Sequence, residues 1–142
     1  MFRPVYDYDQ PRDTADSERV RVSTPPLDLQ VSYRFGPPLV YVSGELDHAS
    51  ADQLRKVLDA ELTERPKVLL LEFSKLSYMD SGGLGLVFET IGRVEAGGWL
   101  GVVGAHDNVR RLMDMTGLSD QSNLRVIPAL DAVPAALANL QD

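Results

Sequence analysis

The residues best placed to do chemistry lie in the segment 78–87, Tyr-Met-Asp-Ser-Gly-Gly-Leu-Gly-Leu-Val. It follows, after a short loop, the apolar run 68–73, which predicts a strand, and it opens a predicted helix. The first amides of a helix lack acceptors within the helix, and the helix dipole is positive there. A phosphate on Ser81 would therefore be well tolerated, because those free amides can bond its oxygens. The two glycines that follow would leave the hydroxyl open to another protein's backbone. We interpret Ser81 as a regulatory hydroxyl on a binding surface.

The same segment also has a purely structural interpretation. Asp and Ser are common at helix N-caps, and glycine is common in loops. The choice between the two interpretations therefore depends on the rest of the chain.

Composition excludes several classes of site. The 142 residues suffice for one domain with a buried core, and a hydrophobic content of 44% with 25% charged residues is typical of a soluble globular protein. The absence of cysteine rules out disulfides, thiolate nucleophiles and thiolate metal ligands, and two histidines leave little for a histidine metal site. We expect neither a cofactor nor a metal.

Charge and hydropathy point to protein partners in the cytoplasm. The formal net charge of −7 argues against binding to nucleic acid or to an anionic membrane surface. No apolar run approaches the roughly 20 residues that a transmembrane helix needs, and the N-terminus lacks the apolar core of a secretory signal. We therefore expect a cytoplasmic protein that binds other proteins.

The elements that must position Ser81 follow from the hydrophobic pattern. Residues 1–26 are predicted to form a flexible polar extension, because they show no period of 2 or 3.6. A single domain is predicted over residues 27–142. Residues 27–35 alternate between apolar and polar side chains and predict a strand. Residues 39–43 return as a second strand after a Gly-Pro-Pro turn, so the two should form an antiparallel hairpin.

Helices and strands alternate after the hairpin. A first helix is capped by Asp47 or Ser50, the latter with Gln53 at capping-box spacing, and a second runs from Ser81 to about Glu95. Strands are predicted at 99–104 and 124–127, a third helix opens with Asp107 as its cap, and a last helix starts at 131. The first two helices carry apolar stripes, made of Leu54, Val57, Leu58 and Leu62 in one and of Leu84, Val87, Phe88 and Ile91 in the other.

This order predicts an α/β fold with a mixed, largely parallel sheet of about five strands, which opens with the antiparallel hairpin and is covered by about four helices. Sites in open sheets of this kind lie beyond the carboxyl ends of the strands. Asp47 and the pair Asp80–Ser81 each follow a strand, so we expect them to be neighbours at one end of the sheet.

The sequence argues against catalysis at Ser81. A serine hydrolase would need Gly-x-Ser-x-Gly, but Met79 takes the first glycine position, and only His48 could serve as the base. A phosphate-cradling loop would need a lysine after its glycines. Asp80 lacks the paired acidic residues with which a phospho-acceptor aspartate binds Mg²⁺. Asp47 and His48 also fit a helix cap followed by a surface histidine.

Three segments resemble the STAS-domain family, and more closely its anti-sigma factor antagonists. They are residues 44–48, Gly-Glu-Leu-Asp-His, residues 76–85, which contain Ser81, and residues 109–118, Val-Arg-Arg-Leu-Met-Asp-Met-Thr-Gly-Leu. The resemblance covers roughly residues 27–140 in the family's order. It implies a STAS-like fold and partner switching in transcription regulation and the stress response.

The resemblance also implies a mechanism. Unphosphorylated, such a protein binds an anti-sigma factor that is an ATP-dependent serine kinase, and so releases the sigma factor. The kinase then phosphorylates the serine here numbered Ser81, the complex dissociates, and a metal-dependent serine phosphatase resets the switch. Residues that would line the interface are Asp47, His48, Asp80, Gly82, Gly83 and Leu84.

One residue departs from the family pattern. Family members usually carry Ser or Thr where this chain has Gly82, so a neighbouring hydroxyl is lost and the efficiency of Ser81 phosphorylation is open. Two alternatives to the switched antagonist stay open as well, a STAS scaffold of a larger signalling assembly that is not itself switched and, more distantly, a Ser81-dependent hydrolase. The sequence leaves the oligomeric state open too.

Overall fold

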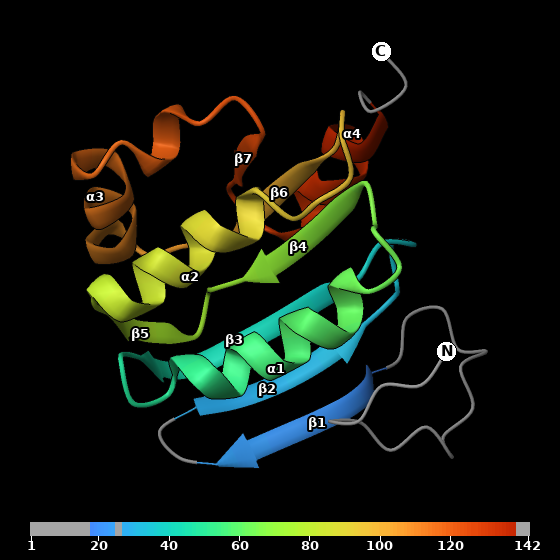
Figure 1. Cartoon of the computed structure of the whole chain (residues 1–142). Coiled ribbons are helices and arrows are strands. Elements are labelled where there is room, and N and C mark those ends of the chain that lie inside the picture. Colours follow the sequence, from blue (N-terminus) through green and yellow to red (C-terminus); the bar gives the residue numbers. More distant parts are fainter. Residues whose placement is uncertain (1–17, 25–26, 139–142) are drawn as a thin grey trace.

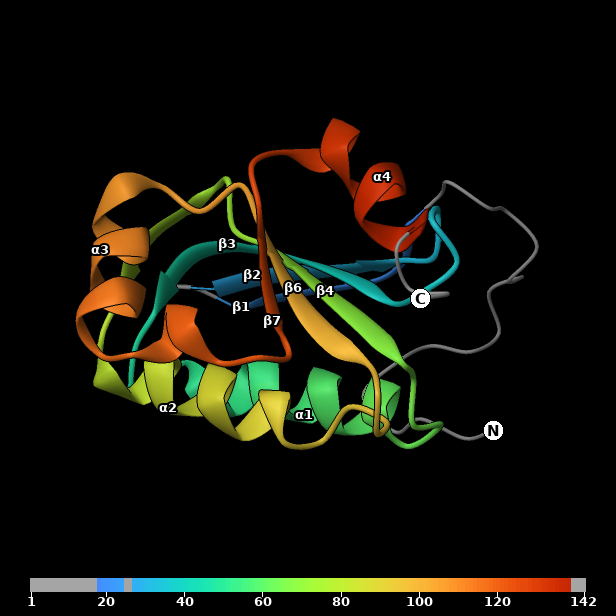
Figure 2. The same ribbon diagram turned by 90° about the horizontal axis from the view of Figure 1, so that it is seen from above.

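The computed structural model describes residues 18–24 and 27–138, in which one mixed sheet carries helices on both faces (Figures 1 and 2). The strands are β1 (Glu18–Thr24), β2 (Leu27–Ser32), β3 (Leu39–Leu46), β4 (Val68–Glu72), β5 (Leu76–Met79), β6 (Trp99–Val103) and β7 (Leu124–Ile127). The helices are α1 (Ala51–Leu62), α2 (Ser81–Ile91), α3 (Asp107–Met115) and α4 (Val133–Ala138), with 3₁₀ turns at Leu118–Asp120 and Leu130–Ala132.

The sheet confirms the predicted topology. Its strand order is β1-β2-β3-β4-β6-β7, with β5 paired to β3 outside this row. The pairs β1–β2 and β2–β3 are antiparallel, and all other pairs are parallel. The expected hairpin and the largely parallel remainder are therefore both present, with two strands more than predicted.

The first additional strand, β1, lies within the predicted polar extension. Its backbone pairs with β2 from Glu18↔Ser32 to Thr24↔Leu27. The expectation of a segment without regular structure is thus wrong over these seven residues. Neither residues 1–17 nor residues 25–26 belong to the described part, and the division of the chain at residue 26 stays a prediction.

The second additional strand, β5, occupies what was predicted to be a short loop before α2. β3 continues to Leu46, three residues past the predicted end at 43, whereas its last pairing with β4 is Tyr41↔Glu72. β5 pairs with the extension of β3 from Gly44↔Leu76 to Leu46↔Met79. This pairing brings the start of α2 to the end of β3.

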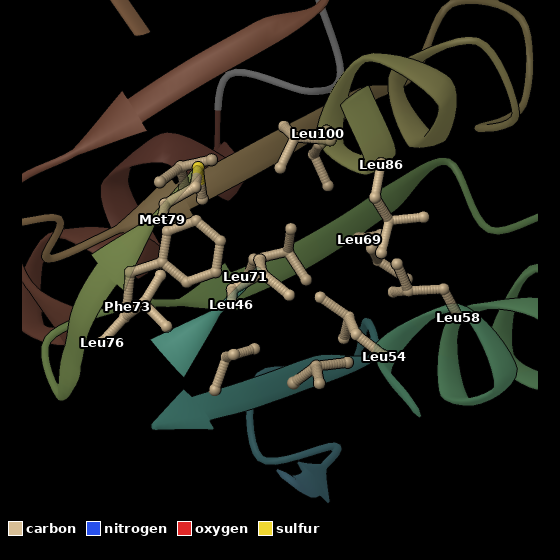
Figure 3. Packing of buried hydrophobic residues seen from close by; sticks show 14 of the residues in the cluster. Leu46, Leu54, Leu58, Leu69, Leu71, Phe73, Leu76, Met79, Leu86 and Leu100 are labelled. Atoms are coloured by element: carbon tan, nitrogen blue, oxygen red, sulfur yellow. The ribbon is translucent and has the colours of Figure 1, made fainter. Parts of the chain in front are cut away.

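The helices form two layers and bury two apolar clusters. Figure 2 shows α1 and α2 on one face of the sheet, α4 on the other, and α3 at one end. The larger cluster lies between the sheet and α1 and α2 (Figure 3). The predicted stripe of α1 is buried in full, and complete burial of one leucine side chain stabilises the fold by about 1.5–3 kcal/mol. The smaller cluster gathers Leu39, Val68, Leu70, Trp99 and neighbours near α4.

Four helix predictions need correction. The last helix, α4, begins at Val133 and not at 131, which lies in the preceding 3₁₀ turn. Phe88 is 36% exposed, because the buried face of α2 is formed by Leu84, Val87 and Ile91 together with Leu86. α2 ends at Ile91, earlier than Glu95. Asp107 is the first residue of α3 and His106 is its N-cap, so Asp107 does not cap the helix.

Candidate functional site

The site lies where β3 and β5 end side by side. Leu46 pairs with Met79 in parallel register, so the residues that follow, Asp47 and Asp80, leave the sheet together. The backbone N–H of Asp80 donates to the carbonyl of Leu46 at 3.2 Å. The expectation that these residues are neighbours at one end of the sheet is confirmed.

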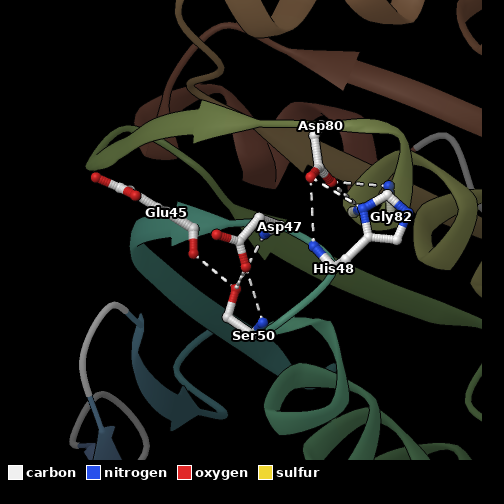
Figure 4. A network of polar contacts seen from close by, with 7 residues as sticks. Glu45, Asp47, His48, Ser50, Asp80 and Gly82 are labelled. Carbon is white, nitrogen blue, oxygen red and sulfur yellow. Dashed lines mark hydrogen bonds and ion pairs between the residues drawn. The ribbon is translucent and has the colours of Figure 1, made fainter.

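The Asp80 carboxylate joins the two segments (Figure 4). Its Oδ1 accepts the backbone N–H groups of Gly82, at 2.8 Å, and Gly83, at 3.3 Å, so Asp80 is the N-cap of α2. Its Oδ2 accepts the backbone N–H of His48 at 3.3 Å and lies 3.1 Å from Nδ1 of the same histidine. Desolvation acts to raise the pKa of Asp80, but the His48 ring and these backbone N–H donors outweigh it and leave the pKa lowered.

This cap corrects one expectation about phosphate. The amides of Gly82 and Gly83 are not free for phosphate oxygens, because the carboxylate of Asp80 already accepts hydrogen bonds from both. A phosphoryl group on Ser81 would have to share this helix end with an existing negative charge.

A turn around a buried serine holds the loop that carries His48. Oδ1 of Asp47 accepts the backbone N–H of Ser50 at 2.9 Å, and the Ser50 hydroxyl in turn accepts the N–H of Asp47 at 3.0 Å. The same hydroxyl donates to the carbonyl of Glu45 at 2.8 Å. Ser50 is the N-cap of α1 but its side chain makes no capping bond, so the predicted capping box with Gln53 does not form. Sequence reasoning assigned Ser50 to a cap and missed this role.

Ser81 is the first residue of α2, and its side chain is exposed. Its hydroxyl makes no hydrogen bond to any residue in the described ranges. The group is therefore available both to solvent and to an incoming protein.

The glycines after Ser81 do not leave a bare surface, contrary to the sequence-based expectation. A Cβ at Gly82 would lie 3.0 Å from both Cα and Cγ of His48, and a Cβ at Gly83 would lie 2.7 Å from Cγ of Leu46. Both residues let the two segments pack closely. Gly85, one turn further on, is open, because a Cβ added there would have nothing within 4 Å.

The structure brings all the sequence-predicted site residues together but buries some of them. His48 is exposed, Asp47, Asp80 and Gly82 are half-buried, and Gly83 and Leu84 are buried. Sequence reasoning did not assign Tyr78, whose side chain on β5 is 48% exposed and lies near the site in sequence. Tyr78 could have been found from its place in β5, but the sequence analysis took this four-residue strand for a loop.

The described residues hold no group of three or more histidine or acidic side chains that could bind a metal ion. Within the same ranges, the helices are too short or too polar to cross a membrane.

Residues 28–132 match the family model of the STAS domain, which is well over half of the chain. The chain belongs to the STAS domain family. This STAS domain is 31% identical over 117 residues to the anti-sigma F factor antagonist of Paenibacillus polymyxa, a match that covers 81% of this chain and 96% of the relative. It is 32% identical over 84 residues to the anti-sigma-B factor antagonist of Listeria monocytogenes, covering 57% of this chain and 72% of the relative.

A solved structure agrees with these relatives. The crystal structure of an anti-sigma factor antagonist from Mycobacterium paratuberculosis superimposes on this STAS domain with a TM-score of 0.72 at 28% identity. The match covers 85% of this chain and 100% of that chain. The fold expected from the sequence resemblance is therefore confirmed.

Proposed function

We propose that this protein is an anti-sigma factor antagonist that binds an anti-sigma factor serine kinase while Ser81 is unphosphorylated, and so releases a sigma factor. The observation that carries the proposal is the Ser81 hydroxyl, which is exposed and has no hydrogen-bond partner among the described residues. It stands at the start of α2, directly beside the loop of Asp47 and His48. Membership of the family and the names of the relatives support this role.

The binding surface is formed by both segments. Asp47, His48, Asp80 and Gly82 present groups at the surface next to Ser81, whereas Gly83 and Leu84 support that surface from beneath. We expect the partner to contact the exposed ring of His48 and the first turn of α2.

Phosphorylation of Ser81 by the kinase switches the contact off. Phosphate adds about two negative charges and a bulky group to a close-packed surface. The surface already carries the Asp80 carboxylate, so a partner surface with acidic groups or nucleotide phosphates would be repelled more strongly after phosphorylation. A serine phosphatase resets the switch, and the cycle takes place in the cytoplasm.

The protein acts by binding and not as an enzyme. A hydrolase would need Ser81 to donate a hydrogen bond to a base, and the Ser81 hydroxyl makes no such bond to His48 although that ring pairs with Asp80. An activity-based serine probe that labels Ser81 would contradict this part of the proposal.

The test is intact-mass spectrometry after incubation with ATP and candidate anti-sigma kinases. We expect a gain of one phosphate that maps to Ser81, and no gain in the Ser81→Ala variant. Complex formation without phosphate from any kinase would instead support the alternative of a STAS scaffold that is not switched. Phosphate on another residue would show that Ser81 is not the switch.

A further inference from the structure

The cap of α2 creates a need for positive charge near Ser81. Asp80 occupies the amides of Gly82 and Gly83, so a phosphoryl group on Ser81 cannot use them without displacing a carboxylate. The Asp80 carboxylate and a phosphoryl group on the next residue are both negative, and neighbouring like charges destabilise each other. In a phosphorylated chain, Asp80 keeps its hydrogen bonds to the start of α2 more readily if a cation lies between its carboxylate and the phosphate.

His48 is the one side chain in residues 44–50 and 76–85 that can carry a positive charge. The nearest lysine in sequence, Lys75, lines a cavity with Tyr41 and Leu130, both of which pack against the cluster near α4. Lys75 therefore belongs to the other face of the sheet, and His48 is the local candidate.

The geometry of the His48 ring suits this role. Its Nδ1 lies 3.1 Å from Oδ2 of Asp80, and its Nε2 makes no hydrogen bond to a residue of the described part. The side chain is 73% exposed, so Nε2 is open to an incoming anion. A protonated imidazole has two N–H donors that point in different directions, and one ring can therefore bond two anions.

Gly82 provides the space for the ring. A Cβ at this position would lie 3.0 Å from Cγ of His48 and 3.1 Å from Oδ1 of Asp80, so a larger residue would push His48 away from its partner. Ser81 stands between Asp80 and Gly82 in the chain, and both of them contact His48. The backbone of Ser81 is therefore flanked on both sides by residues that lie against the ring.

We propose that His48 is the counter-ion of phosphorylated Ser81. In the phosphorylated chain its imidazolium donates Nδ1–H to the carboxylate of Asp80 and Nε2–H to the phosphate, and Gly82 is the residue that lets it do so. The proposal rests on Ser81 being the phosphorylation site. The other charged groups on the surrounding elements are Glu45 at the end of β3, Asp47, which bonds Ser50, and Asp52 in the first turn of α1, which pairs with Arg55 at 3.5 Å. α3, which contacts β5, adds Asp107, Arg110, Arg111 and Asp114, whereas β5 and the first turn of α2 carry none.

The test compares the chain that carries Ser81 with one that carries phosphoserine inserted at the same position during translation. The chain has two histidines, so imidazole ¹⁵N shifts at pH 8, where an ordinary imidazole is almost wholly neutral, report on His48 with His106 as an internal control. At this pH we expect the imidazolium fraction of His48 to rise at least about threefold in the phosphoserine chain, and that of His106 to stay constant. An unchanged His48 ring would overturn the proposal.

Two variants separate the counter-ion from a general effect on folding. Phosphoserine should lower the melting temperature more in His48→Gln than in the parent chain, whereas His106→Gln should behave like the parent. Gly82→Ser should reduce the rise in the imidazolium fraction. Equal losses in His48→Gln and His106→Gln would contradict the proposal. Phosphoserine is inserted during translation, so the His48 measurement does not need a kinase. If no kinase phosphorylated Ser81, the proposed switch would be refuted, but the His48 measurement could still be made and interpreted.

Discussion

The hydroxyl of Tyr33 donates a 2.6 Å hydrogen bond to Oε1 of Glu61, and this bond joins the turn after β2 to the last turn of α1. Glu61 is 1% exposed, and its other oxygen, Oε2, is buried and accepts no hydrogen bond from the described residues. The Tyr33 hydroxyl therefore supplies the hydrogen bond that this buried carboxyl group does make.

Removal of that hydroxyl should destabilise the fold. We expect Tyr33→Phe to lose about 1–3 kcal/mol of the free energy of unfolding, because Glu61 would then stay buried without this donor. Urea denaturation at pH 7 measures the loss. In the Glu61→Leu background the same change should cost much less, and an equal cost in both backgrounds would show that the bond does not carry the effect.

Two glycines of α2 should respond to alanine in opposite ways. Gly83→Ala should destabilise the protein by about 1–3 kcal/mol, because the added carbon meets Cγ of Leu46 at 2.7 Å. Gly85→Ala should stabilise it by about 0.5–1 kcal/mol, because this exposed helical position has free space and alanine favours the helix. The melting temperatures of both variants, compared with that of the parent chain, test these two predictions. A stabilising Gly83→Ala would mean that the two segments pack less tightly than described.

Asp80 should make stability depend on acidity. Its pKa is lowered in the folded chain, so its contribution is present above the pKa of the unfolded chain and is lost as the pH falls through the folded value. We expect the loss to develop below about pH 4. Denaturant midpoints between pH 5 and pH 3 should therefore fall less steeply in Asp80→Asn than in the parent. Asp131→Asn, at an exposed position before α4, serves as the control, and parallel curves for the parent and Asp80→Asn would count against this cap.

A charge at Ser81 should act on binding and leave the fold intact. We expect Ser81→Asp to lose binding to the anti-sigma kinase, because it adds an anion beside Asp80, while its melting temperature stays within a few degrees of the parent. Ser81→Ala should still bind. Calorimetric titration with the kinase measures both. If Ser81→Asp bound as tightly as the parent, repulsion would not be the mechanism of the switch.

Much of the fold was predictable because its signals are local. The alternation in β2, the apolar run of β4 and the stripe of α1 each show in the sequence, and their order alone predicts a largely parallel sheet. β5 was not predictable in the same way. Its four residues gain their strand conformation from pairing with β3, a partner more than thirty positions away.

The site divides along the same line. Ser81 and its neighbours stand out in the sequence. The sequence does not show which group accepts the first amides of α2, because both the Asp80 carboxylate and a phosphate on Ser81 could do so. The fit between His48 and Gly82 depends on the separation of two backbones, which no local pattern encodes.

The pairing of β1 with β2 has a consequence for how the domain can be cut. The family match begins at residue 28, whereas β1 ends at Thr24 and hydrogen-bonds the whole length of β2. A chain trimmed to the matched region would turn an inner strand into an open edge, with unpaired N–H and C=O groups along β2. Such edges recruit strands from other molecules. The trimmed chain should therefore self-associate more strongly in sedimentation experiments than the chain of 142 residues at the same concentration.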